Sequence, residues 1–110
     1  MNKVELLGRM TKDIELKKGK NDNIYGVFTL AIPRKENKDI TDFIDCIAFG
    51  KLAETIKTYT EKGNRLIVNG SLHLDKYTTQ DGQNKTSCSI IVDDFYFVDF
   101  KTKKEEKPLY

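Results

Sequence analysis

Two phenylalanines, Phe43 and Phe49, are the side chains of this sequence with the clearest potential for molecular recognition. They share one parity of a predicted strand over residues 41–49, in the run T-D-F-I-D-C-I-A-F. The opposite parity is also apolar and holds Ile44, Cys46 and Ala48. A strand in the wall of a small barrel needs only one apolar face, so we expect a subunit, a helix or a ligand to cover the second. Spacing alone does not decide whether the two rings pack in an interior or stack on a ligand, because aromatic side chains are common in both places.

Residues that could catalyse a reaction do not converge. Asp42 and Asp45 have opposite parity in the predicted strand, and the Asp93-Asp94 pair is adjacent in sequence, so neither pair shares one face. The single histidine, His73, has no cysteine or second histidine at metal-ligand spacing and is predicted to be a surface residue. A nucleophile paired with a base and a phosphate-binding glycine loop are also missing. We therefore predict neither enzyme activity nor a metal site nor a cofactor.

The composition predicts one soluble domain. The 110 residues are 38% hydrophobic and 33% charged, without an apolar run long enough to span a membrane and without a secretory signal pattern. The two cysteines, Cys46 and Cys88, form neither a disulfide framework nor a C-x-x-C pair, and both are predicted to be small buried thiols. We expect a cytoplasmic protein with no membrane partner.

The net charge of +2 is unevenly distributed. Residues 101–110 contain four lysines and two glutamates, which leaves 15 basic and 15 acidic residues in the first hundred. A polyanion would therefore have to bind to local patches. Two basic clusters occur in turn-like sequence, at residues 17–20 and 34–38, although ordinary solvated loop charge is the commoner explanation for such clusters. We predict a single domain over residues 1–100 and a short, flexible, lysine-rich tail over residues 101–110.

Alternation of apolar and polar residues predicts five strands, over residues 2–10, 25–32, 41–49, 64–77 and 85–92, with the aromatic run 95–100 closing the ordered part. Gly8 is expected to mark a bulge or bend in the first strand, and Ile14 and Leu16 a short continuation of it. The Asp81-Gly82 pair lies between the last two strands and predicts a long hairpin with a loop wider than two residues.

After Gly50 the apolar spacing changes to that of a helix. The pattern predicts an amphipathic helix over residues 51–62, with Gly63 as its left-handed C-terminal stop. One short helix between the third and fourth of five strands is the connectivity of an OB-fold. We therefore predict an all-β fold, a five-stranded Greek-key barrel, whose ligand face commonly binds single-stranded nucleic acid or oligosaccharide.

Five motifs occur in order between Asn2 and about Phe97: N-K-V-E-L-L-G-R-M-T-K-D-I-E-L, F-T-L-A-I, T-D-F-I-D-C-I-A-F-G-K-L-A-E, Y-T-E-K-G and D-K-Y-T-T-Q-D-G-Q. Together they resemble the bacterial single-stranded DNA-binding protein family, and the combination is far more specific than any one motif. The resemblance implies an OB-fold homotetramer, cytoplasmic and nucleoid-associated, that wraps single-stranded DNA without sequence preference.

The resemblance also implies binding roles for individual residues. Phe43, Phe49 and Tyr77 match positions where the family places aromatic rings that stack on bases, which suits a sequence-tolerant binder because every base has a π face. Phosphate contacts are expected at Lys51, Lys62 and Lys76 from the family match, and at Arg34, Lys35 and Lys85 from loop placement alone. Such contacts would supply salt-sensitive affinity.

Three departures from the family pattern affect these expectations. The loop over residues 33–40 is shorter than usual, and Glu36 stands near the place of a further stacking aromatic. His73 and Asp75 stand where family members often carry arginine, which predicts a weaker phosphate contact from this strand. The ending E-E-K-P-L-Y is no close counterpart of the family's long linker and acidic tip. Replication or recombination proteins are candidate partners, but this sequence does not show the acidic tip with which family members recruit them.

The leading hypothesis is a non-catalytic protein that binds and protects single-stranded DNA during replication, recombination, repair or DNA transfer. The alternative is a tail-less OB-fold adaptor that contacts replication proteins, with DNA binding secondary. A small OB-fold nuclease ranks far lower, because the sequence shows no catalytic set.

Overall fold

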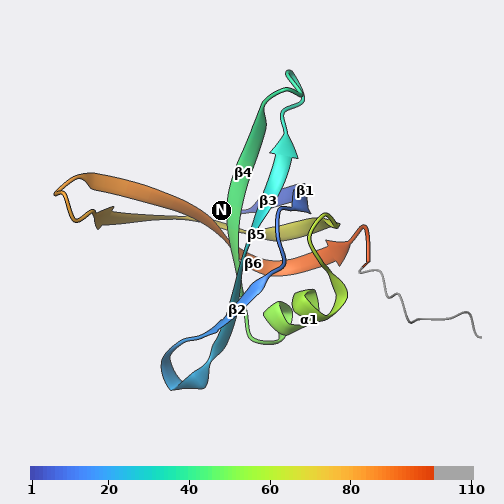
Figure 1. The fold of residues 1–110 in the computed structure, drawn as a ribbon, viewed down its shortest axis with the longest axis horizontal. Coiled ribbons are helices and arrows are strands. Elements are labelled where there is room, and N and C mark those ends of the chain that lie inside the picture. Colours follow the sequence, from blue (N-terminus) through green and yellow to red (C-terminus); the bar gives the residue numbers. More distant parts are fainter. Residues whose placement is uncertain (101–110) are drawn as a thin grey trace, which may run out of the picture.

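Six strands and one α-helix make up residues 1–100, the part of the chain that the computed structural model describes (Figure 1). In chain order the elements are β1 (Val4–Met10), β2 (Glu15–Lys18), the short 3₁₀ turn η1 (Lys20–Asp22), β3 (Ile24–Pro33), β4 (Thr41–Phe49), α1 (Lys51–Tyr59), β5 (Arg65–Thr78) and β6 (Asn84–Phe97). The tail predicted over residues 101–110 lies outside the described residues. Within residues 1–100 no helix has the length and apolar character needed to cross a membrane.

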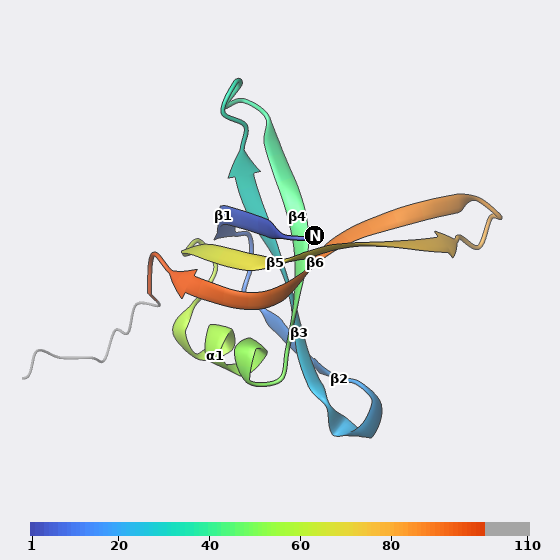
Figure 2. The same ribbon diagram turned by 180° about the vertical axis from the view of Figure 1, so that it is seen from behind.

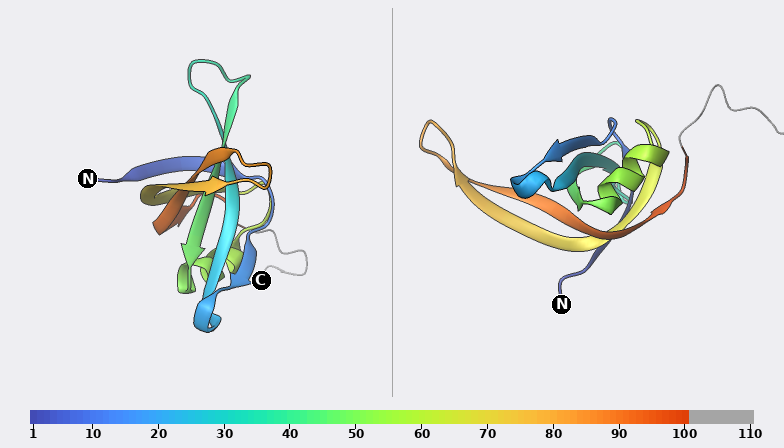
Figure 3. Two further views of the ribbon diagram at one scale, coloured as in Figure 1. Left: turned by 90° about the vertical axis from the view of Figure 1, so that its left-hand side faces the viewer. Right: turned by 90° about the horizontal axis from the view of Figure 1, so that it is seen from below.

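All six strands belong to one sheet with the order β1-β5-β6-β4-β3-β2. Figure 3 shows that this sheet is curved. The end of β1 leaves β5 and pairs with β3 through Arg9–Ala31 and Met10–Leu30, so the strand pairing returns to β3. This arrangement, with α1 between β4 and β5, confirms the predicted OB-fold. The short continuation expected after the first strand forms a separate strand, β2, which pairs with β3.

The core lies between the concave face of the sheet and the inner side of α1. The right-hand view of Figure 3 shows the helix on the inner side of the curved strands. Alternate residues of β3 and β4 point inward, and Ala53 and Ile56 of the helix complete the packing. The buried apolar side chains are Met10, Ile14, Phe28, Leu30, Cys46, Ala48, Ala53, Ile56, Leu66, Val68, Ile90 and Val92. Of the two apolar faces of β4, the one that carries Cys46 and Ala48 therefore points inward, and Ile44 packs against the same cluster.

The helix is shorter than the sequence pattern predicts, because it ends at Tyr59 and not at residue 62. Thr60 is already extended, and both its backbone N–H and its buried hydroxyl donate to the Ile56 carbonyl, at 3.0 and 2.7 Å. Gly63 does have a positive φ of 94°. Its N–H donates to the Met10 carbonyl at 2.8 Å, so Gly63 shapes the turn into β5 and is not the helix stop.

Two glycines, Gly8 and Gly70, permit close approach of strands, and the bulge expected at Gly8 is not found there. At Gly8 the pairing of β1 with β5 is regular, but a Cβ there would lie 2.9 Å from side-chain atoms of Leu30 and Ile32. The register shift of the sheet falls instead between Asn69 and Gly70 of β5. Gly8 is therefore required by the crossing of β1 over β3 and not by a bulge.

The β5–β6 hairpin extends beyond the core as a long ribbon (Figures 1 and 2). Its loop, residues 79–83, is wider than two residues, as predicted. Leu72 and Leu74 have the same parity as the core residues Leu66 and Val68 but are exposed, and Cys88, predicted to be buried, is also exposed, because no other element covers this part of the ribbon. By contrast Cys46 is buried, and burial, with a smaller effect from the neighbouring Asp45, raises the pKa of its thiol to about 12.

Candidate nucleic-acid interface

The outer face of β4 presents both phenylalanines to solvent. Phe43 lies opposite Ala31 and Phe49 opposite Tyr25 in the pairing with β3, and the exposed fractions of the two phenylalanines are 65% and 54%. Rings packed in the core of the barrel would be buried, so the structure shows that Phe43 and Phe49 are not core residues of the barrel. Two aromatic side chains are thus available on one face of one strand.

Tyr25 adds a third ring beside Phe49. The centroids of these two rings are 6.2 Å apart and their planes are inclined by 40°. Tyr25 is not among the site residues predicted from the sequence. Its proximity to Phe49 can be inferred only when the register of β3 against β4 is known. The one sequence signal for Tyr25 is its position in the alternation of β3, which places it on the face opposite to Phe28 and Leu30.

Tyr77 lies on the same face of the sheet, further out along the hairpin. The pairs Asp45–Ser89 and Tyr77–Lys85 connect β4, β6 and β5, and direct partners project from the same face. Alternation along β6 therefore places Tyr77 and Lys85 on the face that carries Phe43 and Phe49. Tyr77 is 49% exposed. Lys76 pairs with Thr86 and projects from the opposite face, so the structure does not bring it to this surface.

Lys51 is the first residue of α1 and follows Phe49 after a single glycine. Gly50 adopts a positive φ of 60°, and its N–H donates to the Ile24 carbonyl at 2.7 Å. This bond holds the start of the helix against β3. The exposed Lys51 side chain therefore begins close to the outer aromatic face.

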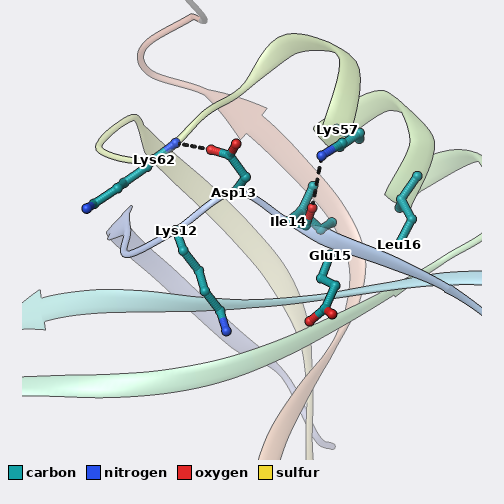
Figure 4. Close-up of a pocket in the computed structure, with 7 residues that line it drawn as sticks. All are labelled: Lys12, Asp13, Ile14, Glu15, Leu16, Lys57 and Lys62. Carbon is teal, nitrogen blue, oxygen red and sulfur yellow. Dashed lines mark hydrogen bonds between the residues drawn. The ribbon is translucent and has the colours of Figure 1, made fainter.

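Lys62 lies in a second basic area, a pocket between the β1–β2 connection and the end of α1 (Figure 4). Its backbone N–H donates to Asp13 Oδ1 at 2.7 Å, while its ammonium group extends away from that carboxylate. Lys12 and Lys57 line the same pocket, and Lys57 Nζ donates to the Ile14 carbonyl at 3.4 Å. The sequence did not indicate these two lysines, because they meet Lys62 only in the folded chain.

Arg34 is the predicted phosphate ligand whose charge is already compensated. Its Nε and Nη2 lie 3.1 Å from Asp42 Oδ2 and Oδ1, and this hydrogen bonding together with the carboxylate charge raises the pKa of the guanidinium. Lys35 is exposed in the same loop, where the Arg34 N–H donates to the Ile40 carbonyl at 2.9 Å. Of the two, Lys35 is the more available to a phosphate.

The carboxylates near this surface have separate partners. Asp42 faces Arg34, whereas Asp45 accepts a 2.8 Å hydrogen bond from the Thr29 hydroxyl on the outer face. Within residues 1–100 no three His, Cys, Asp or Glu side chains gather in a way that could hold a metal ion. Fold and surface together define an OB-fold binding domain with an exposed face of aromatic rings and lysines.

Comparison with known proteins makes the assignment specific. Residues 1–98 match the single-strand binding protein family, so the chain belongs to this family. The resemblance predicted from the sequence motifs is confirmed.

Several relatives carry the name single-stranded DNA-binding protein. The protein of Clostridium perfringens is 45% identical over 100 residues, which cover 90% of this chain and 67% of the relative. The protein of the onion yellows phytoplasma is 36% identical over 108 residues, which cover 94% of this chain and 99% of the relative. A solved structure described as the Plasmodium falciparum SSB complex with ssDNA matches with a TM-score of 0.77 and 27% identity, over 90% of this chain and 96% of that one.

Proposed function

We propose that this protein binds single-stranded DNA without sequence preference and protects it, without catalysing a reaction on it. Family membership and the likeness to a structure solved with single-stranded DNA support the ligand. The observation that carries the mode of binding is the exposure of Phe43, Phe49 and Tyr77 on one continuous face of the sheet.

In the proposed complex bases stack on these three rings and lysines contact the phosphates. Stacking on an aromatic side chain contributes about 1–3 kcal/mol per base and tolerates any base. Lys85 projects from the face of Tyr77 and Lys51 follows Phe49 after one glycine, whereas Lys62 lies in the pocket beside α1. DNA held in this way cannot reanneal and is shielded from nucleases, which is the requirement during replication, recombination, repair and DNA transfer.

We also propose that copies of the chain associate, as a homotetramer. β1 pairs with β5 along one edge, and its other edge is unpaired between Val4 and Gly8 within the described residues. Leu7 and Tyr96, exposed by 50% and 54%, add apolar surface on the outer side of this region. Unpaired edges and exposed apolar side chains favour association. Mass measurement by light scattering tests this: a monomeric mass at micromolar concentration would refute the tetramer.

The DNA-binding proposal is tested by titrating labelled oligo-dT and a duplex of equal length at low salt. We expect tight binding of oligo-dT and weak binding of the duplex. Phe43→Ala, Phe49→Ala and Tyr77→Ala should each weaken oligo-dT binding by about 1–3 kcal/mol, which is about 5- to 150-fold. Equal affinity for duplex and oligo-dT would refute the proposed ligand, and unchanged affinity of the triple variant would refute the stacking assignment.

A further inference from the structure

The β2–β3 hairpin continues the outer aromatic face beyond Phe49. In the pairing of β2 with β3, Lys17 lies opposite Tyr25, and in the pairing of β3 with β4, Tyr25 lies opposite Phe49. Direct partners project from one face, so the three side chains form a row across three strands. This row ends in a lysine at the edge of the sheet, because β2 is the last strand in the order.

The Tyr25 ring in this row has Phe49 and Gly19 as neighbours. Phe49 lies at a centroid distance of 6.2 Å, and a Cβ built on Gly19 would lie 3.6 Å from the Tyr25 Cε1 atom. Gly19 itself is held by its N–H, which donates to the Asn23 carbonyl at 2.7 Å. Tyr25 is only half-buried, so part of its ring remains open to a ligand that has reached Phe49.

The tip of the hairpin has the charge that a phosphate backbone requires. Residues 17–23 include Lys17, Lys18 and Lys20 against a single acid, Asp22, and all four are exposed. Among residues 1–100 none of these lysines lies within ion-pair distance of a carboxylate, since the ion pairs found there belong to Arg34 and Arg65. Glu15 lies opposite Val27 on the same face, so the favourable potential is confined to the tip.

We propose that the DNA path runs from Phe49 onto the β2–β3 hairpin, with Tyr25 as a further base-stacking ring and Lys17 as its phosphate contact. This inference rests on the proposed function and extends its site. Phe49 and Tyr25 would receive neighbouring bases, and the backbone would pass over Lys17 at the sheet edge.

Substitution at Tyr25 separates stacking from packing. Tyr25→Phe retains the ring and should bind oligo-dT within about twofold of the unsubstituted chain. Tyr25→Leu retains apolar bulk without a π face and should lose about fivefold or more in affinity. Lys17→Gln should weaken binding and reduce the slope of log K against log salt by about 0.7, whereas the matched control Lys3→Gln, beside Glu5 and Asp94, should not.

Photocrosslinking gives a readout that does not depend on affinity. An oligo-dT containing 5-iododeoxyuridine, irradiated on the unsubstituted protein, should yield a crosslinked peptide that contains Tyr25. If oligo-dT does not bind at all, the proposed function fails. If it binds and Phe49→Ala weakens it, while Tyr25→Leu and Lys17→Gln bind normally and no Tyr25 crosslink forms, this inference alone is overturned. Should Tyr25→Leu fail to fold by circular dichroism, Lys17→Gln and the crosslink decide.

Discussion

The outer face of β4 carries one acidic side chain among apolar ones, and this has an energetic consequence. Asp45 and Ile47 lie between Phe43 and Phe49 on the same face of the strand. The Asp45 carboxylate is exposed and accepts one hydrogen bond from Thr29. A fixed negative charge between two stacking rings repels the phosphates of any strand bound there.

Asp45→Asn should therefore strengthen DNA binding. The amide oxygen can still accept the Thr29 hydrogen bond, so the main change is the loss of one negative charge. Two unit charges 4 Å apart in water interact by about 1 kcal/mol, and phosphates are expected to be more distant, so we expect about a two- to threefold gain in affinity at low salt. Titration at two salt concentrations checks this, because screening should reduce the gain. A loss of affinity would show that the carboxylate accepts hydrogen bonds from the bases.

Parity in the sequence correctly divided the side chains of β4 into two faces, but spacing alone did not show which face points outward. It could not show whether another element covers a given face. Cys88 and Leu74 have the parity of core residues, yet both are exposed because the hairpin extends past the barrel. The pairing of Arg34 with Asp42 could not be predicted either, since it depends on how the two strands are aligned.

Strands and turns were more predictable than their boundaries and partners. Five alternating runs and one helical run were enough to predict the OB-fold connectivity from residue spacing. The helix end was misplaced because the N–H groups of Glu61 and Lys62 donate to the side chains of Asn64 and Asp13, which apolar spacing does not reveal. The Tyr25–Phe49 neighbourhood was missed because sequence periodicity predicts faces but not register.

Gly70→Ala should destabilise the chain by about 1–3 kcal/mol or more, as overpacking does. The β5–β6 register shifts between Asn69 and Gly70, and a Cβ at Gly70 would lie 2.1 Å from the Ile91 carbonyl oxygen, which is backbone and cannot rotate away. Urea denaturation measures the change in the free energy of unfolding. Gly82→Asn is the control, because a Cβ there meets nothing within 4 Å and asparagine tolerates its positive φ of 87°. Equal effects of the two substitutions would contradict the close-approach argument.

The segment that follows β6 is joined to the start of β5 by a pH-sensitive contact. Asp99 accepts hydrogen bonds from the Arg65 side chain, Nε at 3.0 Å and Nη2 at 3.2 Å, and from the Arg65 N–H at 2.9 Å. These bonds, the side-chain ones first, lower the pKa of Asp99 from 3.8 to about 2. A depressed folded-state pKa contributes stability that is present above the unfolded value and is lost as pH falls through the folded one.

Asp99→Asn should therefore lower the melting temperature at neutral pH, and the gap to the unsubstituted chain should narrow as pH falls from about 4 to about 2. Thermal melts followed by circular dichroism over this range provide the measurement. A gap that stays constant down to about pH 2 would show that Asp99 acts through its shape and not through its charge.

Residues 1–100 as a whole give DNA no uniform attraction, because they carry equal numbers of basic and acidic side chains. Affinity must then come from the arrangement of a few groups on one side of the sheet. Aromatic rings supply a component that salt does not weaken, and lysines supply one that it does. The two components should be separable by measuring binding across salt concentrations.

For single-stranded DNA the slope of log K against log salt is about −0.7 for each phosphate contact. Lys85→Gln should make this slope shallower by about 0.7, because Lys85 shares the face of Tyr77. Phe49→Ala should lower affinity at every salt concentration and leave the slope unchanged. Arg34→Gln should leave the slope nearly unchanged as well, since the Arg34 charge is compensated by Asp42. If Arg34→Gln instead changed the slope as much as Lys85→Gln, the ion pair would have to open on binding, and the β3–β4 loop would belong to the DNA path.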